Sequence, residues 1–222
     1  MSYQHINIEG HPIPYSLGKI VCVGQNYADH IQEMNSQTSS QAVFFIKPRT
    51  AACRLSDDIV LPSNQGSCHH EIELALLIGQ PLHRATIQSA QESIVGYTLA
   101  IDLTLRDLQA QLKAQGHPWE KAKGFDGAAP LGPWLPYQGE NLQDMILELR
   151  KNGQIVQHSS TELMLRDCIT LLSEASQYFS FEPGDVLLTG TPSGVGPLVH
   201  GDHLQLQLSD KLSIQTKVRT HA

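Results

Sequence analysis

The sequence predicts a β-rich α+β domain. Short apolar runs bounded by Gly, Pro or polar residues recur along most of the 222 residues, and such runs are typical of strands. Only two long segments have a helical pattern, and they do not alternate regularly with the strands, which argues against a doubly wound sheet. We expect strands over residues 20–23, 43–46, 59–61, 70–78, 95–102, 145–150, 154–158, 186–188 and 203–208.

A tight turn is predicted between residues 145–150 and 154–158. The connection contains Asn152-Gly153, and both residue types tolerate a positive φ angle. Asn-Gly between two short strand-like runs is a strong local signal for a β-hairpin. We therefore expect these two segments to be neighbouring antiparallel strands.

Two longer segments are predicted to be helices. Residues 104–115 begin with Thr104 and Asp107, which resemble a capping box, and Gly116 ends the segment. Residues 161–179 have the apolar period of a helix. The side chains expected near one face of that helix are Leu165, Ile169, Leu172 and Ala175.

The chain length indicates one main domain. A chain of this size can bury a hydrophobic core without disulfide staples. We expect residues 1–18 to form a small N-terminal leader element and residues 19–222 to form a single domain. The polar stretch 35–41 has the composition of a loop.

The charge balance limits the partners. Lysine and arginine total 15 against 22 for aspartate and glutamate, which gives a net charge of −7. An acidic surface argues against a nucleic-acid partner, because phosphates need a basic footprint. It does not argue against an anionic small substrate, since the local field of a cleft can oppose the net charge.

The chain is expected to be cytoplasmic and to bind no membrane. Its N-terminus lacks a basic region followed by an apolar run, and no apolar stretch is long enough to span a bilayer. The four cysteines have no close pair, which is typical of reduced thiols rather than of a disulfide framework or a structural zinc site. They are Cys22, Cys53, Cys68 and Cys168.

Two glutamates stand in the most informative segment, residues 69–78. Side chains on a strand alternate, so Glu71 and Glu73 point to the same side, which continues into Ala75 and Leu77. Two carboxylates beside apolar neighbours repel each other unless a proton or a cation intervenes, and a hard divalent cation is a natural solution. The alternative is a strand end at which both acids reach water, and the segment alone leaves both interpretations open.

Asp102 follows the apolar run 95–101. An acid just before a helix is most often a cap, but it could also be a third oxygen ligand. Thr104 with Asp107 already provides a cap, which favours the ligand interpretation. Three carboxylates and several waters would suit Mg²⁺ or Mn²⁺ better than Zn²⁺.

Arg106 and Gln109 are three residues apart and are therefore neighbours on the predicted helix. They could bind a substrate carboxylate or carbonyl, the arginine through its planar fork. A solvated helix face is the alternative, and the spacing alone favours it.

Two glycine-rich loops could also contribute to a site. Lys123 lies in a Gly/Pro-rich loop and could stabilise an oxyanion or enolate, although most such lysines are ordinary surface residues. Residues 190–196 contain three glycines, which allow a close backbone approach to an anionic ligand. This loop lacks the lysine and the spacing of a P-loop and is weak support by itself.

His30 and Glu33 are three residues apart on a predicted short helix and could form a catalytic dyad in which the histidine acts as general base. Glu33 would hold the imidazole and raise its basicity. The polar loop that follows makes this element a candidate lid. A surface histidine beside a surface glutamate is the alternative.

Six motifs, in this order, span nearly the whole chain. They are Val23-Gly24-Gln25-Asn26-Tyr27, Phe45-Ile46-Lys47-Pro48, Glu71-Ile72-Glu73-Leu74, Asp102-Leu103-Thr104-Leu105-Arg106-Asp107-Leu108-Gln109, Lys123-Gly124-Phe125-Asp126 and Gly190-Thr191-Pro192-Ser193-Gly194-Val195-Gly196. Together they resemble the fumarylacetoacetate hydrolase superfamily over about residues 19–208. The short chain with His30 and Glu33 is most similar to the acylpyruvate hydrolase and oxaloacetate decarboxylase branch.

The resemblance implies a mixed β-roll, usually a homodimer, in which residues 19–222 are the catalytic domain. It implies one Mg²⁺ or Mn²⁺ held by Glu71, Glu73 and Asp102. By position, His30, Glu33 and Lys123 would be catalytic, the first two from a lid near residues 26–42. Contacts with a keto-acid substrate are implied for Arg106, Gln109, Thr191, Gln25 and Lys47. Gln25 stands where many relatives of this branch have arginine, which removes a possible carboxylate partner.

The function expected from this resemblance is metal-dependent hydrolysis of a carbon–carbon bond in 2,4-diketo acids, such as acylpyruvates or fumarylpyruvate. The His30–Glu33 pair would deprotonate a water, and Lys123 would stabilise a pyruvate enolate. Oxaloacetate decarboxylation needs the same enolate without the water. One alternative is an isomerase or decarboxylase of 2-oxo-ene-dioates from aromatic catabolism. Another is a ligand-binding module that has lost turnover. The presence of His30, Glu33 and Lys123 argues against it.

Overall fold

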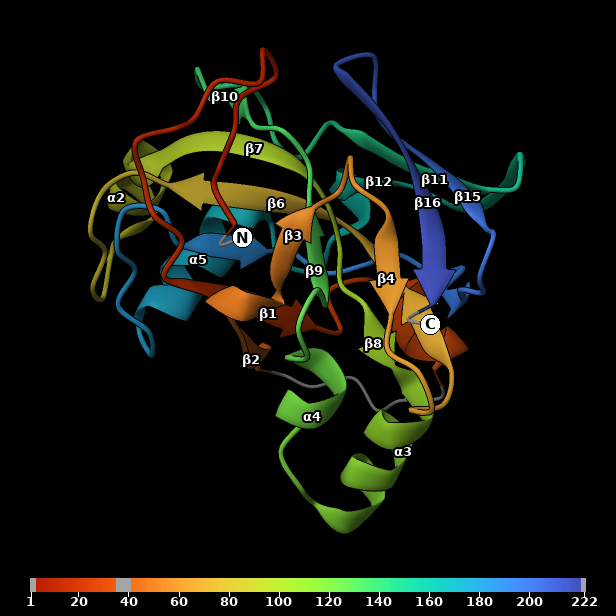
Figure 1. The fold of residues 1–222 in the computed structure, drawn as a ribbon. Coiled ribbons are helices and arrows are strands. Elements are labelled where there is room, and N and C mark those ends of the chain that lie inside the picture. The colour runs from red at the N-terminus through yellow and green to blue at the C-terminus, as the bar shows by residue number, and fades with distance from the viewer. Residues whose placement is uncertain (1–2, 35–40, 221–222) are drawn as a thin grey trace.

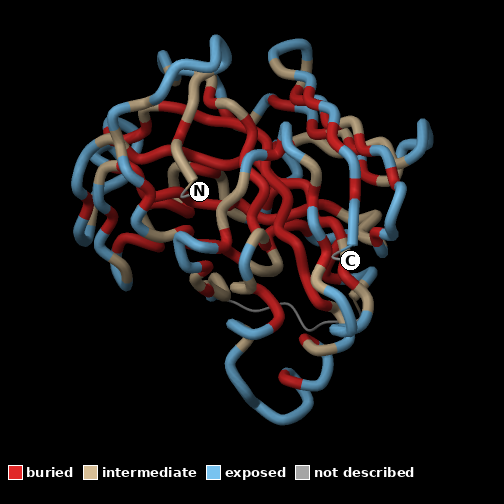
Figure 2. Tube along the Cα trace, viewed as in Figure 1, coloured by how far each residue is buried: buried red, intermediate tan, exposed pale blue. Residues whose placement is uncertain are grey.

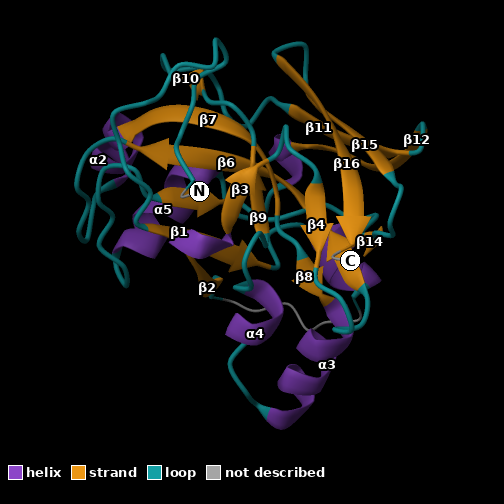
Figure 3. Ribbon diagram, in the orientation of Figure 1, coloured by secondary structure: helices purple, strands orange, loops and turns teal. Residues whose placement is uncertain are grey.

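The computed structural model of the protein describes residues 3–34 and 41–220. It confirms the β-rich α+β class: three sheets form the body, and short helices cover the ends (Figures 1 and 3). The largest sheet has eight strands. Its order is β2 (Val43–Pro48), β1 (Lys19–Gly24), β13 (Val186–Leu188), β6 (Ile72–Ile78), β7 (Ile94–Ile101), β9 (Ala129–Leu131) and β3 (Ala52–Arg54), with β10 (Leu135–Pro136) paired to β7.

Two smaller sheets complete the mixed β-roll. The five-stranded sheet has the order β12 (Gln154–Ser160), β11 (Ile146–Lys151), β15 (His203–Leu208), β16 (Leu212–Thr220) and β4 (Ile59–Leu61). The three-stranded sheet has the order β14 (Gly196–Pro197), β5 (Cys68–His70) and β8 (Thr104–Leu105). Parallel pairs such as β1 with β13 stand beside antiparallel pairs such as β6 with β7, so the sheets are mixed.

The core lies around β6 and β7, where buried residues gather at the centre of the molecule (Figure 2). Every residue of β6 is buried, because both faces of this strand are covered. The side of the strand that carries Glu73, Ala75 and Leu77 is therefore not a solvated face. This burial is what gives the carboxylates of the segment an unusual environment.

The helices are short. They are α1 (Ala28–Glu33), α2 (Ile87–Ser93), α3 (Arg106–Gln115), α4 (Glu120–Lys123) and α5 (Cys168–Ser176), with single 3₁₀ turns at η1 (Arg49–Ala51) and η2 (Thr161–Leu163). α3 and α4 project together from one end of the molecule (Figure 1). None of these helices, within the described ranges, has the length and apolar character needed to cross a membrane.

The predicted start of the helix over 104–115 is wrong. The helix begins at Arg106, and the preceding two residues form β8. Thr104 and Asp107 do not cap it: the Thr104 hydroxyl donates to Glu71 at 3.0 Å, and the Asp107 carboxylate accepts from the backbone N–H of Ser67. Both side chains are drawn to partners outside the helix. Gly116 ends the helix as predicted, in the left-handed conformation.

The predicted helix over 161–179 is also too long. Residues 161–163 form a 3₁₀ turn, and the α-helix begins only at Cys168. Asp167 is its N-cap, because its carboxylate accepts from the backbone N–H of Thr170 at 2.8 Å. Leu165 therefore lies before the helix, and it is 47% exposed.

The predicted hairpin is confirmed. β11 and β12 are antiparallel neighbours joined by Asn152-Gly153, with φ angles of 52° and 82°. Two consecutive positive φ values are those of a type I′ turn, which matches the twist of the flanking strands. This hairpin positions β12 for the contacts with the site that are described below.

Residues 3–18 pack on the rest of the described chain. Bridges join Ile6 to Pro12 and Asn7 to Trp134. His5 is fully buried, and its Nε2–H donates to the carbonyl of Gly184 at 2.9 Å. Its Nδ1 has no hydrogen-bond partner among the described residues, so a proton on that nitrogen would be buried without an acceptor.

His5 is expected to make the fold sensitive to acid. Burial lowers the pKa of His5 to about 4, against the opposing effect of the Gly184 carbonyl, whereas the unfolded chain titrates near about 6.5. The unfolded state therefore binds more protons below about pH 6.5, and stability falls as the pH drops toward 4. At pH 5 the loss from this group amounts to about 2 kcal/mol.

Urea unfolding of His5→Gln at pH 7.5 and at pH 5.0 measures this loss. The difference in free energy of unfolding between the two pH values should be about 2 kcal/mol smaller in the variant than in the wild type. The exposed His11→Gln is the matched control and should behave as the wild type. The same pH dependence in His5→Gln and wild type would contradict this account.

Candidate active site

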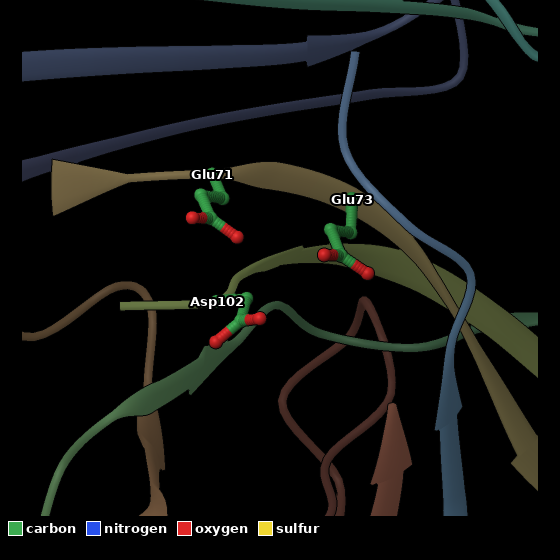
Figure 4. A group of neighbouring side chains, drawn as sticks. All are labelled: Glu71, Glu73 and Asp102. Carbon is green, nitrogen blue, oxygen red and sulfur yellow. The ribbon is translucent and has the colours of Figure 1, made fainter. Parts of the chain in front are cut away.

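Three acidic side chains meet where β6 and β7 lie side by side. Ile72 pairs with Ile101, and the backbone N–H of Asp102 donates to the carbonyl of Glu71 at 2.8 Å. This register places Asp102 opposite Glu71, while Glu73 follows on the same face of β6. One oxygen of each side chain lies within 4.8 Å of the others, and the carboxyl groups face a common space (Figure 4).

All three acids are buried. The alternative in which the glutamates reach water at a strand end is therefore excluded. Burial of three like charges within one space is unfavourable unless cations or protons compensate them. The group offers oxygen ligands only, which is the donor set that Mg²⁺ and Mn²⁺ prefer, so the residues fit a hard divalent cation.

Three cationic side chains surround the acids. Lys123 Nζ lies 2.9 Å from Glu71 Oε2 and 2.6 Å from Asp102 Oδ2. Arg106 pairs with the other oxygen of Glu71, and Lys47 Nζ lies 2.7 Å from Asp102 Oδ1. Burial lowers the pKa of Lys123, but Asp102 and Glu71 outweigh this effect and hold it above its ordinary value. Lys123 is therefore charged where it contacts the acids.

The two glutamates differ in their electrostatics. Burial raises the pKa of Glu71, but Lys123 and then Arg106 outweigh it, so the pKa lies below its ordinary value. Burial, Asp102 and Glu71 all raise the pKa of Glu73 well above its ordinary value. Within residues 3–34 and 41–220, its carboxylate accepts one hydrogen bond, from the backbone N–H of Gly190 at 2.6 Å from Oε2. Glu73 is thus the acid whose charge the surrounding cations compensate least.

Lys47 lies behind the acids rather than in front of them. Its side chain is fully buried, pairs with Asp102, and donates to the carbonyl of Leu103 at 3.2 Å and to that of Lys123. It does not line the cavity in front of the acids. The predicted substrate contact of Lys47 is therefore not supported by its position, which is that of a residue that holds Asp102.

A cavity opens in front of the three acids. The predicted site residues that line it are Gln25, His30, Glu71, Glu73, Asp102, Arg106, Gln109, Lys123 and Thr191. Sequence reasoning missed its apolar wall. Phe45 and Trp119 line the cavity with ring centroids 5.9 Å apart, and Lys123 Nζ lies 5.1 Å from the Phe45 ring. No sequence pattern around Trp119 indicates a site residue, because it reaches the cavity only through the packing of α4 against β2.

Arg106 and Gln109 are neighbours as the helical spacing predicted. Arg106 Nη1 donates to Gln109 Oε1 at 2.7 Å. Arg106 Nε and Gln25 Oε1 are buried with no hydrogen-bond partner among the described residues. A buried donor and a buried acceptor at the edge of one cavity are available to a polar ligand.

His30 and Glu33 are in contact. His30 Nδ1 lies 3.2 Å from Glu33 Oε2, and the other oxygen, Glu33 Oε1, accepts from the backbone N–H of Gly194 at 3.0 Å. The glycine loop therefore holds Glu33, and Glu33 holds the imidazole. The predicted lid near residues 26–42 includes residues 35–40, which lie outside the described residues.

The first residue of the glycine loop requires glycine. Gly190 has a φ of +97°, and a Cβ at this position would lie 2.7 Å from the Cβ of Asn26. The close approach lets its N–H reach Glu73 and places Thr191 at the cavity. The loop thus contacts a candidate metal ligand at one end and Glu33 at the other.

Comparison with known proteins agrees with this arrangement. Residues 19–219 match the family model described as fumarylacetoacetate hydrolase C-terminal. The chain is 46% identical to oxaloacetate tautomerase YcgM of Escherichia coli, over 97% of this chain and 99% of that protein. Two solved structures are similar over nearly their whole length. They are a fumarylacetoacetate hydrolase family protein of Yersinia pestis (TM-score 0.95, 45% identity, 97% and 100% of the chains) and fumarylpyruvate hydrolase of Pseudomonas aeruginosa in complex with Mn²⁺ and pyruvate (TM-score 0.92, 30% identity, 99% and 97% of the chains).

The match of the family model covers most of the chain, and the aligned relatives cover nearly all of it. The resemblance drawn from the six motifs is thereby confirmed, as is the mixed β-roll that it implied. The chain belongs to the fumarylacetoacetate hydrolase family.

Proposed function

We propose that the protein catalyses keto–enol tautomerisation of a 2-keto acid whose C3 protons lie between two carbonyl groups, with oxaloacetate as the leading substrate. One observation carries the proposal: His30, which Glu33 contacts, and Lys123 line the same cavity as the three acids. Enolisation needs a base for the C3 proton and a cation beside the C2 oxygen. The name of the Escherichia coli relative supports the choice of oxaloacetate.

Glu71, Glu73 and Asp102 would hold one divalent cation, Mg²⁺ or Mn²⁺. Bound there, the cation supplies a Lewis acid that draws electrons from the keto group of the substrate. The Mn²⁺ in the fumarylpyruvate hydrolase of Pseudomonas aeruginosa supports this assignment. Lys47 contributes by fixing the orientation of Asp102.

Arg106, Gln109, Gln25 and Thr191 would bind and orient the substrate. Arg106 Nε has no hydrogen-bond partner in the part of the chain that the structure describes, and it can donate to a carboxylate oxygen, which binds a charged donor more strongly than a neutral one. The amide of Gln25 provides a neutral polar contact in the same cavity. The rings of Phe45 and Trp119 exclude water from one side, which strengthens the electrostatic contacts inside.

The proton transfer is assigned to His30 and Lys123. Contact with the Glu33 carboxylate fixes the proton of the imidazole on Nδ1, so Nε2 has a free lone pair. His30 Nε2 accepts the proton from C3, the electron pair of the broken C–H bond forms the C2–C3 double bond, and the π pair of the keto group moves to the C2 oxygen. Lys123 Nζ donates a hydrogen bond to this oxygen and stabilises its negative charge. After release, the enolate oxygen takes up a proton from water and His30 returns its proton to water, which completes the enol. The same steps in reverse convert enol to keto acid.

Hydrolysis of acylpyruvates is the second candidate, and the His30–Glu33 contact favours it. The same pair could deprotonate a water that attacks the distal carbonyl, after which the carbon–carbon bond breaks to a pyruvate enolate and a carboxylic acid. The similarity to fumarylpyruvate hydrolase supports this reaction. Both reactions develop an enolate at the C2 oxygen, but tautomerisation breaks a C–H bond, whereas hydrolysis consumes a water and breaks a carbon–carbon bond.

A substrate panel separates the two candidates. With Mg²⁺ present, the purified protein should accelerate the interconversion of enol and keto oxaloacetate, followed by absorbance of the enol. Acetylpyruvate and fumarylpyruvate should be cleaved much more slowly, if at all. Rapid cleavage of an acylpyruvate into two acids, without acceleration of the oxaloacetate interconversion, would contradict the order of the two candidates.

Glu73→Gln is expected to abolish metal-dependent turnover and to preserve the fold. The amide can still accept from the Gly190 N–H, but it cannot supply a charged ligand. Mg²⁺ affinity, measured by calorimetry, should fall at least about 100-fold, and kcat at subsaturating Mg²⁺ should fall with it.

The metal-free stability of the same variant provides a second measurement. Its free energy of unfolding should equal or exceed that of the wild type, because a neutral amide avoids the cost of burying Glu73 beside Asp102 and Glu71, the same cost that raises the pKa of Glu73. The exposed Glu92→Gln is the matched control, with unchanged Mg²⁺ affinity. Normal Mg²⁺ affinity in Glu73→Gln would rule out this residue as a ligand.

His30→Gln tests the assigned base. Loss of a general base typically costs about 10²- to 10⁴-fold in rate, so kcat for oxaloacetate tautomerisation should fall within that range. Mg²⁺ affinity should stay at the wild-type value, because His30 is not a ligand. The exposed His117→Gln serves as control. A kcat within about twofold of the wild type would remove His30 from the proton transfer.

A further inference from the structure

A buried glutamine on β12 contacts two elements that carry the site, from the neighbouring sheet. Gln157 is 1% exposed, and its amide makes four hydrogen bonds. Oε1 accepts from the backbone N–H of Ile72 at 3.1 Å and lies 3.0 Å from His70 Nδ1. Nε2 donates to Thr191 Oγ1 and to the carbonyl of Pro192, both at 2.9 Å. The amide thereby uses both its acceptor and its two donors.

The backbone partners fix the orientation of this amide. The N–H of Ile72 can only donate, and the carbonyl of Pro192 can only accept. Oxygen must therefore face Ile72, and nitrogen must face Pro192. It follows that His70 carries its proton on Nδ1 and donates to the same oxygen. Burial lowers the pKa of His70, which agrees with a neutral imidazole.

The two sides of the amide lead to different parts of the site. Ile72 lies between the acids Glu71 and Glu73 on β6. Thr191 lines the cavity, and the loop that contains it continues to Gly194, whose N–H holds Glu33. Gln157 therefore connects the segment that contains Glu71 and Glu73 to the glycine loop, whose Gly194 N–H binds Glu33.

The loop is also seated directly on β12. A Cβ at Gly194 would lie 1.9 Å from the carbonyl oxygen of Val156, the residue before Gln157. Gly194 has a φ of +95°, which favours glycine for a second reason. β12 thus supports the loop at Gly194 by backbone contact and at Thr191 and Pro192 through the amide of Gln157.

We propose that Gln157 is a positioning residue for the reaction, acting through Thr191 and the Glu33–His30 pair. This inference rests on the proposed function, because it assigns His30 as base. Loss of the hydrogen bonds that Nε2 donates to Thr191 and Pro192 should make the glycine loop more mobile, while the three acids keep their positions. Turnover should then fall, whereas metal affinity should change little.

Gln157→Glu tests the donated hydrogen bonds of the amide separately from the accepted ones. A carboxylate still accepts from Ile72 N–H and His70 Nδ1–H, but it cannot donate to the Pro192 carbonyl. Gln157→Met removes both sides in a side chain of similar length. Gln154→Glu and Gln154→Met, at an exposed position of the same strand, are the matched controls. If Gln157→Met does not fold, Gln157→Glu alone decides the outcome.

Hydrogen exchange, metal binding and kinetics are measured on each variant. In Gln157→Glu, exchange at the backbone amides of residues 190, 191, 193 and 194 should be about tenfold faster than in Gln154→Glu. Mn²⁺ affinity should stay within about threefold of the wild type, because no ligand moves. For oxaloacetate tautomerisation kcat should fall about 10- to 100-fold, the cost of a displacement near 1 Å, with a smaller change in KM.

The outcomes decide separately on the contact, on its role and on the proposed function. Exchange equal to that of the control would overturn the inference. Exchange faster than in the control together with an unchanged kcat would show that Gln157 has a structural role only, and this result would also overturn the inference. If the wild type acts on no substrate of the panel, the proposed function fails, and the inference fails with it as a statement about catalysis. Exchange and Mn²⁺ affinity would then still report whether the amide holds the loop.

Discussion

Three buried carboxylates that share one space are the constraint on which the rest of the structure depends. Like charges in an apolar environment are tolerated only with compensation, and each nearby element supplies part of it. α4 brings Lys123, α3 brings Arg106 and β2 brings Lys47. The backbone N–H of Gly190 completes the set at Glu73. The β-roll can be understood as the scaffold that brings these distant segments to one end of β6 and β7.

The same arrangement explains why the site suits enol chemistry. The acids and their cations form one charged side of the cavity, and the rings of Phe45 and Trp119 form an apolar side. A keto acid placed between them would have its oxygens at the charged side and its C3 protons open to His30. A dry, charged site of this kind favours charge development at the C2 oxygen, which is the step that tautomerisation, decarboxylation and hydrolysis have in common.

Much of this account could be predicted from the sequence, because it follows from short-range patterns. Alternation placed Glu71 and Glu73 on one face, and Asn-Gly placed the hairpin. The prediction was wrong where a side chain binds a distant partner. The spacing of Thr104 indicates a helix cap, but its hydroxyl donates to Glu71. Lys47 and Gln157 show the same limit. Their contacts lie 34 to 87 residues away along the chain, so no local spacing could indicate them.

The most direct measurement is anomalous diffraction from a crystal grown with Mn²⁺. The account predicts one Mn²⁺ per chain, with oxygen ligands from Glu71, Glu73 and Asp102 and with the ammonium group of Lys123 beside it rather than on it. Anomalous density absent from this space, while Glu71 and Asp102 remain paired with the lysines and the arginine at saturating Mn²⁺, would contradict the central claim.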